Sequence, residues 1–165
     1  MSKTQYTTQN NLLLNKMYEF YAKNNNIEKI LPIINGESMI SLRLIDWFVT
    51  NYSKKHYTVL KWNENGSEKR FKVYYDYKLR LKAYSKKRFD PFCRWERINM
   101  PYEDGTSIQT TLGQLNFFKW ALDNKIIDYI KKNMDSINND MNKRNSTSKN
   151  TKKERKSAKT RKKRE

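Results

Sequence analysis

The sequence predicts a small α+β domain in which helices surround a β-hairpin or small antiparallel sheet, followed by a disordered basic tail. Three observations favour this fold class. Residues 57–62 and 69–75 have strand-like composition and flank Asn65-Gly66, a strong signal for a two-residue hairpin turn. Apolar side chains recur at helical spacing on both sides of this hairpin. From Ser136 onwards the apolar content falls away and basic residues dominate.

These patterns divide the chain into a disordered N-terminus at residues 1–10, a single α+β domain at 11–137 and a disordered basic tail at 138–165. A chain of 165 residues, of which 36% are hydrophobic and 13% aromatic, is long enough to build one core. No apolar run approaches the roughly 20 residues that span a bilayer, and the polar first residues lack a secretory signal pattern. We therefore expect an intracellular protein with no membrane attachment.

Helices are expected at four segments with apolar residues on one side: 12–23, 41–54, 112–123 and 125–134. Ser41 is placed to cap the second of them. Thr111 and Gln114 match a capping box at the start of the third, in which the glutamine side chain reaches back to the cap. A short strand is expected just before this cap, at residues 107–110.

The Asn65-Gly66 turn also fixes which residues of the hairpin lie opposite each other. One face pairs Leu60 with Phe71 and Thr58 with Val73, and is apolar. The other face carries the remaining pairs, which are Lys61 with Arg70, Val59 with Lys72 and Tyr57 with Tyr74. Like charges directly opposite each other destabilise a sheet. This face therefore indicates either side chains spread into solvent or an anionic partner.

The segment that follows, residues 77–87, fits two structures. Basic and apolar residues alternate as in a strand, whereas good helix formers without β-branching favour a helix. We favour the helix, in which Lys78, Lys82 and Lys86 form one basic stripe. Asp90-Pro91 should end this element, since the residue before proline is pushed out of the helical region.

Positive charge is concentrated in two parts of the chain, whose formal net charge is +18. Residues 54–100 hold 14 Lys/Arg against 5 Asp/Glu, together with 5 of the 11 tyrosines and 2 of the 4 tryptophans. Residues 142–165 hold 12 Lys/Arg against 2 Asp/Glu. Clustered charge of one sign attracts polyanions, and basic residues interleaved with aromatics are typical of nucleic-acid binding.

The sequence offers little for catalysis. His56 is the single histidine and Cys93 the single cysteine, so neither a multi-histidine metal site nor a disulfide or cysteine-based zinc site is expected. The four glycines are isolated and form no phosphate-binding loop. Asp76, Asp90 and Glu96 could serve a metal-dependent nuclease, but their spacing matches no such motif and salt bridges with arginine are the simpler interpretation. We expect a non-enzymatic protein without metal or cofactor.

Two segments carry a resemblance to a known group of proteins. They are YKLRLKAYSKKRFDPFCRWERI at residues 77–98 and TTLGQLNFFKWALDNKIIDYI at residues 110–130. The chain resembles a family of uncharacterised small basic proteins of nucleocytoplasmic large DNA viruses, the class that includes mimivirus-like and phycodnavirus-like agents. The resemblance implies a viral setting, in a viral factory, the host nucleus or the virion, and it implies no catalytic residue.

The function we predict is binding of nucleic acid, most simply DNA, with little sequence preference. The hairpin and the basic segment after it would form the contact surface. Phosphates would be neutralised by Lys61, Arg70, Lys72, Lys78, Lys82, Lys86, Arg88, Arg94 and Arg97, and Tyr57 and Tyr74 could stack on unpaired bases. The alternative is a virion-structural or protein-interaction module, including a transcription accessory factor, that uses the same block to bind an acidic viral or host protein.

Overall fold

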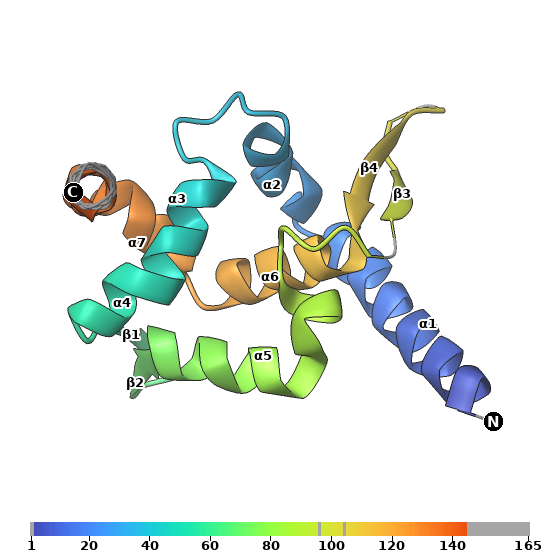
Figure 1. The fold of residues 1–165 in the computed structure, drawn as a ribbon, viewed down its shortest axis with the longest axis horizontal. Helices are drawn as coiled ribbons and strands as arrows, with labels where there is room; N and C mark the ends of the chain where they lie inside the picture. Colours follow the sequence, from blue (N-terminus) through green and yellow to red (C-terminus); the bar gives the residue numbers. More distant parts are fainter. Residues whose placement is uncertain (1, 96, 104, 145–165) are drawn as a thin grey trace, which may run out of the picture.

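The computed structural model describes residues 2–95, 97–103 and 105–144, and it confirms an α+β fold with two separate antiparallel hairpins (Figure 1). The elements follow in the order α1 (Ser2–Tyr21), α2 (Asn26–Ile34), α3 (Leu42–Trp47), the π-helical turn η1 (Phe48–Tyr52), α4 (Ser53–Lys55), β1 (Val59–Glu64), β2 (Ser67–Lys72), α5 (Val73–Phe89), β3 (Arg97–Pro101), β4 (Ser107–Thr111), α6 (Leu112–Asp123) and α7 (Ile126–Lys132). Residues 134–144 are also helical. The basic residues at 145–165, and Glu96, lie outside the described residues.

Helix α6 forms the centre of the core. It lies between α5 and α1, with α7 following it along the chain (Figure 1). Leu115, Phe117, Phe118 and Ala121 on this helix are fully buried, so it is covered on most of its circumference. The predicted N-cap is confirmed, because the Thr111 hydroxyl accepts a hydrogen bond from the backbone N–H of residue 114 at 3.1 Å.

The reciprocal half of the expected capping box differs. The Gln114 side-chain oxygen accepts a hydrogen bond from the Thr110 hydroxyl at 2.6 Å instead of reaching back to the backbone of the cap. Gly113, one residue into the helix, lets α6 approach the end of α5 closely. A Cβ at this position would stand 2.8 Å from the carbonyl oxygen of Asp90. The Asn116 amide secures the same junction by donating to the carbonyl oxygen of Arg88 at 2.9 Å.

The register predicted for the first hairpin is confirmed within its ladder. Leu60 lies opposite Phe71, Lys61 opposite Arg70 and Val59 opposite Lys72. Asn65 and Gly66 both have positive φ, at 52° and 80°, as the mirror-image turn of a two-residue hairpin requires.

The ladder lies closer to the turn than predicted, however: it runs from the Val59–Lys72 pair to the Glu64–Ser67 pair, and the second arm does not reach residue 75. Helix α5 begins at Val73, which is fully buried, and Tyr57 adopts a left-handed φ of 49°. One hydrogen bond, from the Val73 N–H to the Thr58 carbonyl at 3.2 Å, extends the pairing. Tyr57 and Tyr74 are consequently not a cross-strand pair, because the chain turns at both residues.

Residues 77–87 are helical as favoured, within α5, and the helix ends at Asp90-Pro91 as predicted. The helix is kinked at Ser85, whose φ of 68° and ψ of 167° are not helical. The predicted strand before α6 is confirmed as β4. Its partner β3, which pairs Met100 with Ile108, was missed.

Both ends of the domain extend further than predicted. Helix α1 begins at Ser2, where residues 1–10 were expected to be disordered. The polar Asn10 is buried there and accepts a hydrogen bond from Arg88 Nε at 2.7 Å, a contact that apolar periodicity cannot reveal.

At the other end, residues 138–144 are helical although the tail was expected to start at 138. Ile137 and Met141 are buried, and Asp140 accepts hydrogen bonds from Trp47 Nε1 at 3.1 Å and from Lys55 Nζ at 2.9 Å. None of the helices in the described ranges is long and apolar enough to cross a membrane.

One half-buried carboxyl group gives the fold a testable pH dependence. Burial, with the nearby Asp90 carboxylate, raises the pKa of Asp46 to about 6. The folded state therefore binds this proton more tightly than the unfolded state, so this group's contribution to stability falls as pH rises from about 4 to about 6. We expect Asp46→Asn to raise the free energy of unfolding at pH 7 by about 1–2 kcal/mol, after allowance for partial exposure, and to change it little near pH 4. Urea unfolding of both chains at the two pH values measures this difference, and an equal effect at both would contradict it.

Candidate nucleic-acid interface

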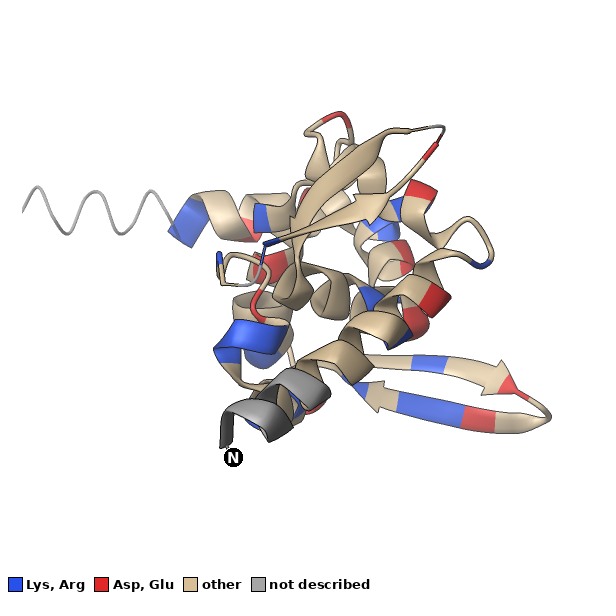
Figure 2. Ribbon diagram, turned by 90° about the vertical axis from the view of Figure 1, so that its right-hand side faces the viewer, with Lys and Arg blue, Asp and Glu red and all other residues tan. Residues whose placement is uncertain are grey.

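The first hairpin projects from the body of the domain (Figure 2). Residues 63–70 at its end are all exposed. Its base is held by the apolar face, on which Leu60 is buried and the ring of Phe71 lies 6.0 Å from that of Trp120 in α6. The hairpin is therefore an arm anchored at one end, with its other face free to meet a partner.

That other face is basic. Lys61, Arg70 and Lys72 are exposed on it, with Lys61 directly opposite Arg70. Among the described residues the ion pairs of lysine and arginine involve Lys55, Lys69, Arg80 and Lys119, so the three cations of this face are in none of them. Their mutual repulsion is not relieved within the described part of the domain.

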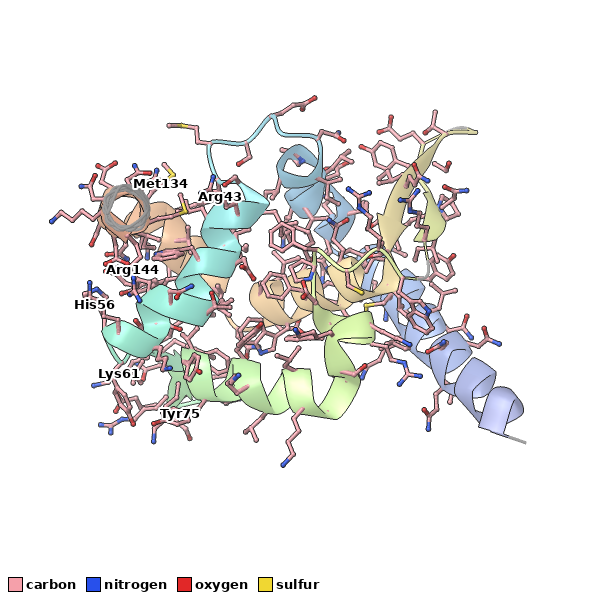
Figure 3. The ribbon with its side chains drawn as sticks, viewed as in Figure 1. Arg43, His56, Lys61, Tyr75, Met134 and Arg144 are labelled. Atoms are coloured by element: carbon pink, nitrogen blue, oxygen red, sulfur yellow. The ribbon has the colours of Figure 1, made fainter. Side chains whose placement is uncertain are left out.

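A pocket of about 100 Å³ lies where this face meets α4 and the start of α5. Its walls are formed by Ser53, Lys54, Tyr57, Thr58, Val59, Lys72, Tyr74 and Tyr75. Tyr57 and Tyr75 are each 55% exposed, and their rings meet edge to face with centroids 5.9 Å apart. Tyr75 and Lys61 lie at the same end of the molecule (Figure 3).

Three lysines surround the tyrosines of this pocket. Lys54 Nζ and Lys78 Nζ lie 5.5 Å and 5.9 Å from the ring centre of Tyr74, and Lys72 Nζ lies 6.0 Å from that of Tyr75. Tyr74 lies in the first turn of α5 and is half-buried. A ring holds an ammonium group without neutralising its charge, so these lysines remain able to pair with an anion.

The basic surface continues around the outer edge of β1. A groove of about 430 Å³ runs between this strand and α7, and Val59 borders both it and the pocket. Lys61, Lys125 and Lys132 line the groove together with one acidic residue, Asp128. Lys125 Nζ lies 5.3 Å from the ring centre of Trp62. The pocket and the groove are thus neighbours at the hairpin base, and the lysines that line them outnumber the acidic side chains.

The structure brings together only part of the predicted contact set. Lys61, Arg70, Lys72, Lys78, Tyr57 and Tyr74 gather at the hairpin and its base, and Lys82 is exposed one turn beyond Lys78 on α5. Lys86 lies past the kink at Ser85. Arg88 is half-buried and donates to Asn10, and Arg94 and Arg97 lie in or beside β3, away from the hairpin (Figure 1). These last three residues do not join the surface, because they lie beyond the kink at Ser85 and the chain runs from there towards α1 and β3.

The residues considered for catalysis have structural contacts. Trp120 Nε1 donates to Asp76 Oδ2 at 2.6 Å, and Arg80 pairs with the same carboxylate at 3.6 Å. Asp90 accepts a hydrogen bond from the backbone N–H of residue 92. The His56 ring contacts that of Tyr52, with ring centres 4.3 Å apart and the planes tilted by 40°. Within the described ranges, no group of three His, Cys, Asp or Glu side chains is placed to hold a metal ion.

Comparison with known protein families gives one match that covers residues 1–165, to a family of unknown function, DUF7197. The chain belongs to this family. A curated relative is the uncharacterised protein L507 of Acanthamoeba polyphaga mimivirus, which is 42% identical to this chain over 143 residues. The alignment covers 83% of this chain and 55% of the relative, so the chain spans about half the length of that protein. No solved structure matches the chain.

The mimivirus relative confirms that this DUF7197 chain resembles a protein of a large DNA virus.

Four residues of the basic surface were missing from the predicted set: Lys54, Tyr75, Lys125 and Lys132. The sequence predicts Tyr75 at the end of a strand, whereas it lies in the first turn of α5. Lys125, just before α7, and Lys132, at its end, lie more than 50 positions beyond the hairpin, and only the tertiary fold brings them to it.

Proposed function

We propose that this protein is a non-enzymatic nucleic-acid-binding protein of a large DNA virus, with the hairpin and its base as the contact surface. The observation that carries the proposal is the exposed group of Lys61, Arg70 and Lys72, which form no ion pair with a described residue, beside a pocket of tyrosines. Such a face suits the phosphate backbone, because each lysine or arginine that meets a phosphate releases a condensed counterion.

The basic sequence at residues 145–165 also supports this proposal, because it holds 10 Lys/Arg and only 2 Asp/Glu. Figure 2 shows that the hairpin and residues 134–144 leave the body on opposite sides. We propose that this basic sequence adds affinity to that of the hairpin, because its clustered positive charge also attracts phosphates. Because phosphate contacts carry no sequence information, we expect weak sequence preference. A viral factory, the host nucleus or the virion is the setting that this function implies.

Fluorescence anisotropy of labelled DNA with the full chain, across a salt series, tests the proposal. We expect binding at low salt whose logarithm falls steeply and linearly with the logarithm of salt concentration. Two unrelated sequences of equal length should bind within a few-fold of each other. Absence of binding at low salt would contradict the proposal.

A second candidate function rests on the groove beside β1. The outer edge of this strand has no strand partner in the described residues, and an extended acidic segment of another protein could pair with it while meeting Lys61, Lys125 and Lys132. This is the protein-interaction alternative. Salt-sensitive binding to an acidic peptide, together with none to DNA in the same buffer, would favour it.

A further inference from the structure

We infer that the pocket between Tyr57 and Tyr75 takes an unpaired base of a single-stranded nucleic acid, an inference that rests on the proposed function. The two tyrosine rings are more than half exposed, at 55% each. Large aromatic side chains are seldom left so open beside one another without a binding role. Tyr57 is moreover held at a left-handed φ of 49°, a conformation that a bulky residue adopts only where the surroundings enforce it.

The geometry of the two rings suits a flat ligand. Their planes meet at 72° with centroids 5.9 Å apart, so together they form a corner. A planar base can stack on the face of one ring while its rim meets the other ring. Base–aromatic stacking is favourable for every base, because every base has a π-face, and it therefore matches binding without sequence preference.

The charges around the corner suit the rest of a nucleotide. Lys54, Lys72 and Lys78 lie at the pocket or on its rim, held by cation–π contacts with Tyr74 and Tyr75. Within the described part of the chain, no acidic side chain lines the pocket. A base in the corner thus has ammonium groups available for its neighbouring phosphates. The groove beyond Val59, with Lys125 and Lys132, offers the next part of the strand a path.

The shape of the pocket selects against a duplex. A base in a double helix is stacked and paired, and it can enter a concave pocket only after being flipped out, which costs a few kcal/mol. A single strand has no such barrier. The pocket should therefore add affinity for single strands alone, while the phosphate contacts of the hairpin act on single strands and duplexes alike.

The test compares three labelled DNA probes of equal length with the full chain: a single strand, a duplex and a strand of abasic sites, which keeps the phosphates and lacks the bases. The variants are Tyr57→Ala/Tyr75→Ala and, as a matched control, Leu79→Ala. Leu79 is also on α5, is 66% exposed and does not line the pocket.

We expect the wild type to bind the single strand at least about tenfold more tightly than the abasic strand. The double tyrosine variant should lose about 10- to 100-fold affinity for the single strand, with little change for the abasic strand or the duplex. Leu79→Ala should bind like the wild type, and circular dichroism should show both variants folded. An RNA strand of the same sequence distinguishes the two sources of unpaired bases.

The outcomes distinguish a failure of the base pocket from a failure of the proposed function. Equal wild-type binding to the single and abasic strands, or an equal loss on all three probes in the double variant, would overturn the base pocket and leave the basic hairpin standing. No binding to any of the three probes would overturn the proposed function, and the pocket with it.

Discussion

Replacing Lys61, Arg70 and Lys72 together with alanine should weaken binding of the full chain to nucleic acid more than any other surface change of the same charge. Each phosphate contact contributes about 0.7 to the slope of log affinity against log salt for a single strand and about 0.9 for a duplex. The slope should therefore fall by about two units for a single strand and about three for a duplex. At about 0.1 M salt this corresponds to a loss of about 100-fold or more.

The matched control removes Lys16, Arg94 and Arg97. These residues are exposed, carry the same total charge and lie on α1, before β3 and in β3, away from the hairpin. Two of them belonged to the contact set predicted from the sequence, so the control also tests how the structure narrows that set. Equal losses in the two triple variants would show that only the total charge matters and would contradict a defined hairpin surface.

Replacing Trp120 with alanine should cost about 3–5 kcal/mol of the free energy of unfolding, the usual range for a large buried aromatic side chain. This side chain is 5% exposed, and its ring contacts the rings of Phe71, Tyr77, Phe89 and Phe117. It therefore links the hairpin to α5 and α6. Its removal would leave a cavity at the point where the arm is anchored.

Trp120→Phe is the control for this substitution. Phenylalanine keeps an aromatic ring in the cluster but cannot donate to Asp76, so we expect a smaller loss, dominated by that hydrogen bond and by the volume difference. Urea unfolding of the three chains measures both effects. A loss below about 1 kcal/mol for the alanine variant would mean that the hairpin is not anchored through this residue.

The parts of the fold that were predictable depend on local chemistry. Asn65-Gly66 accepts positive φ at both positions, and this alone determines the register that puts Lys61 opposite Arg70. Ser41 was predicted as a helix cap because a serine side-chain oxygen can accept a hydrogen bond from the first turn. In the structure its hydroxyl accepts one from the backbone N–H of residue 44 at 3.1 Å. Each of these features needs only a few neighbouring residues.

The errors occurred where contacts between distant parts of the chain decide the structure. Helix α1 extends through a polar segment that Arg88 helps to hold by binding Asn10, and residues 138–144 are secured by contacts of Asp140 with Trp47 and Lys55. The strand β3 depends on its pairing with β4. None of these pairings leaves a periodic pattern in the sequence.

The candidate site shows the same division. The charged face of the hairpin followed from its register, whereas the pocket depends on Val73 starting a helix and thereby turning Tyr75 towards Tyr57. Arg88 was predicted as a phosphate contact because it lies in the basic segment. Its half-buried side chain instead holds α1 against the end of α5.

The most direct test of the hairpin surface is to record backbone amide NMR spectra of the full, isotope-labelled chain while a short single-stranded DNA is added. We predict that the largest shifts fall on residues 54–61 and 70–78, with smaller ones on α7 and little change in β3. Additional changes at 145–165 would fit a second contribution from the C-terminal basic sequence. Shifts confined to 145–165, with the hairpin unchanged, would contradict the account, because the folded surface would then play no part in binding.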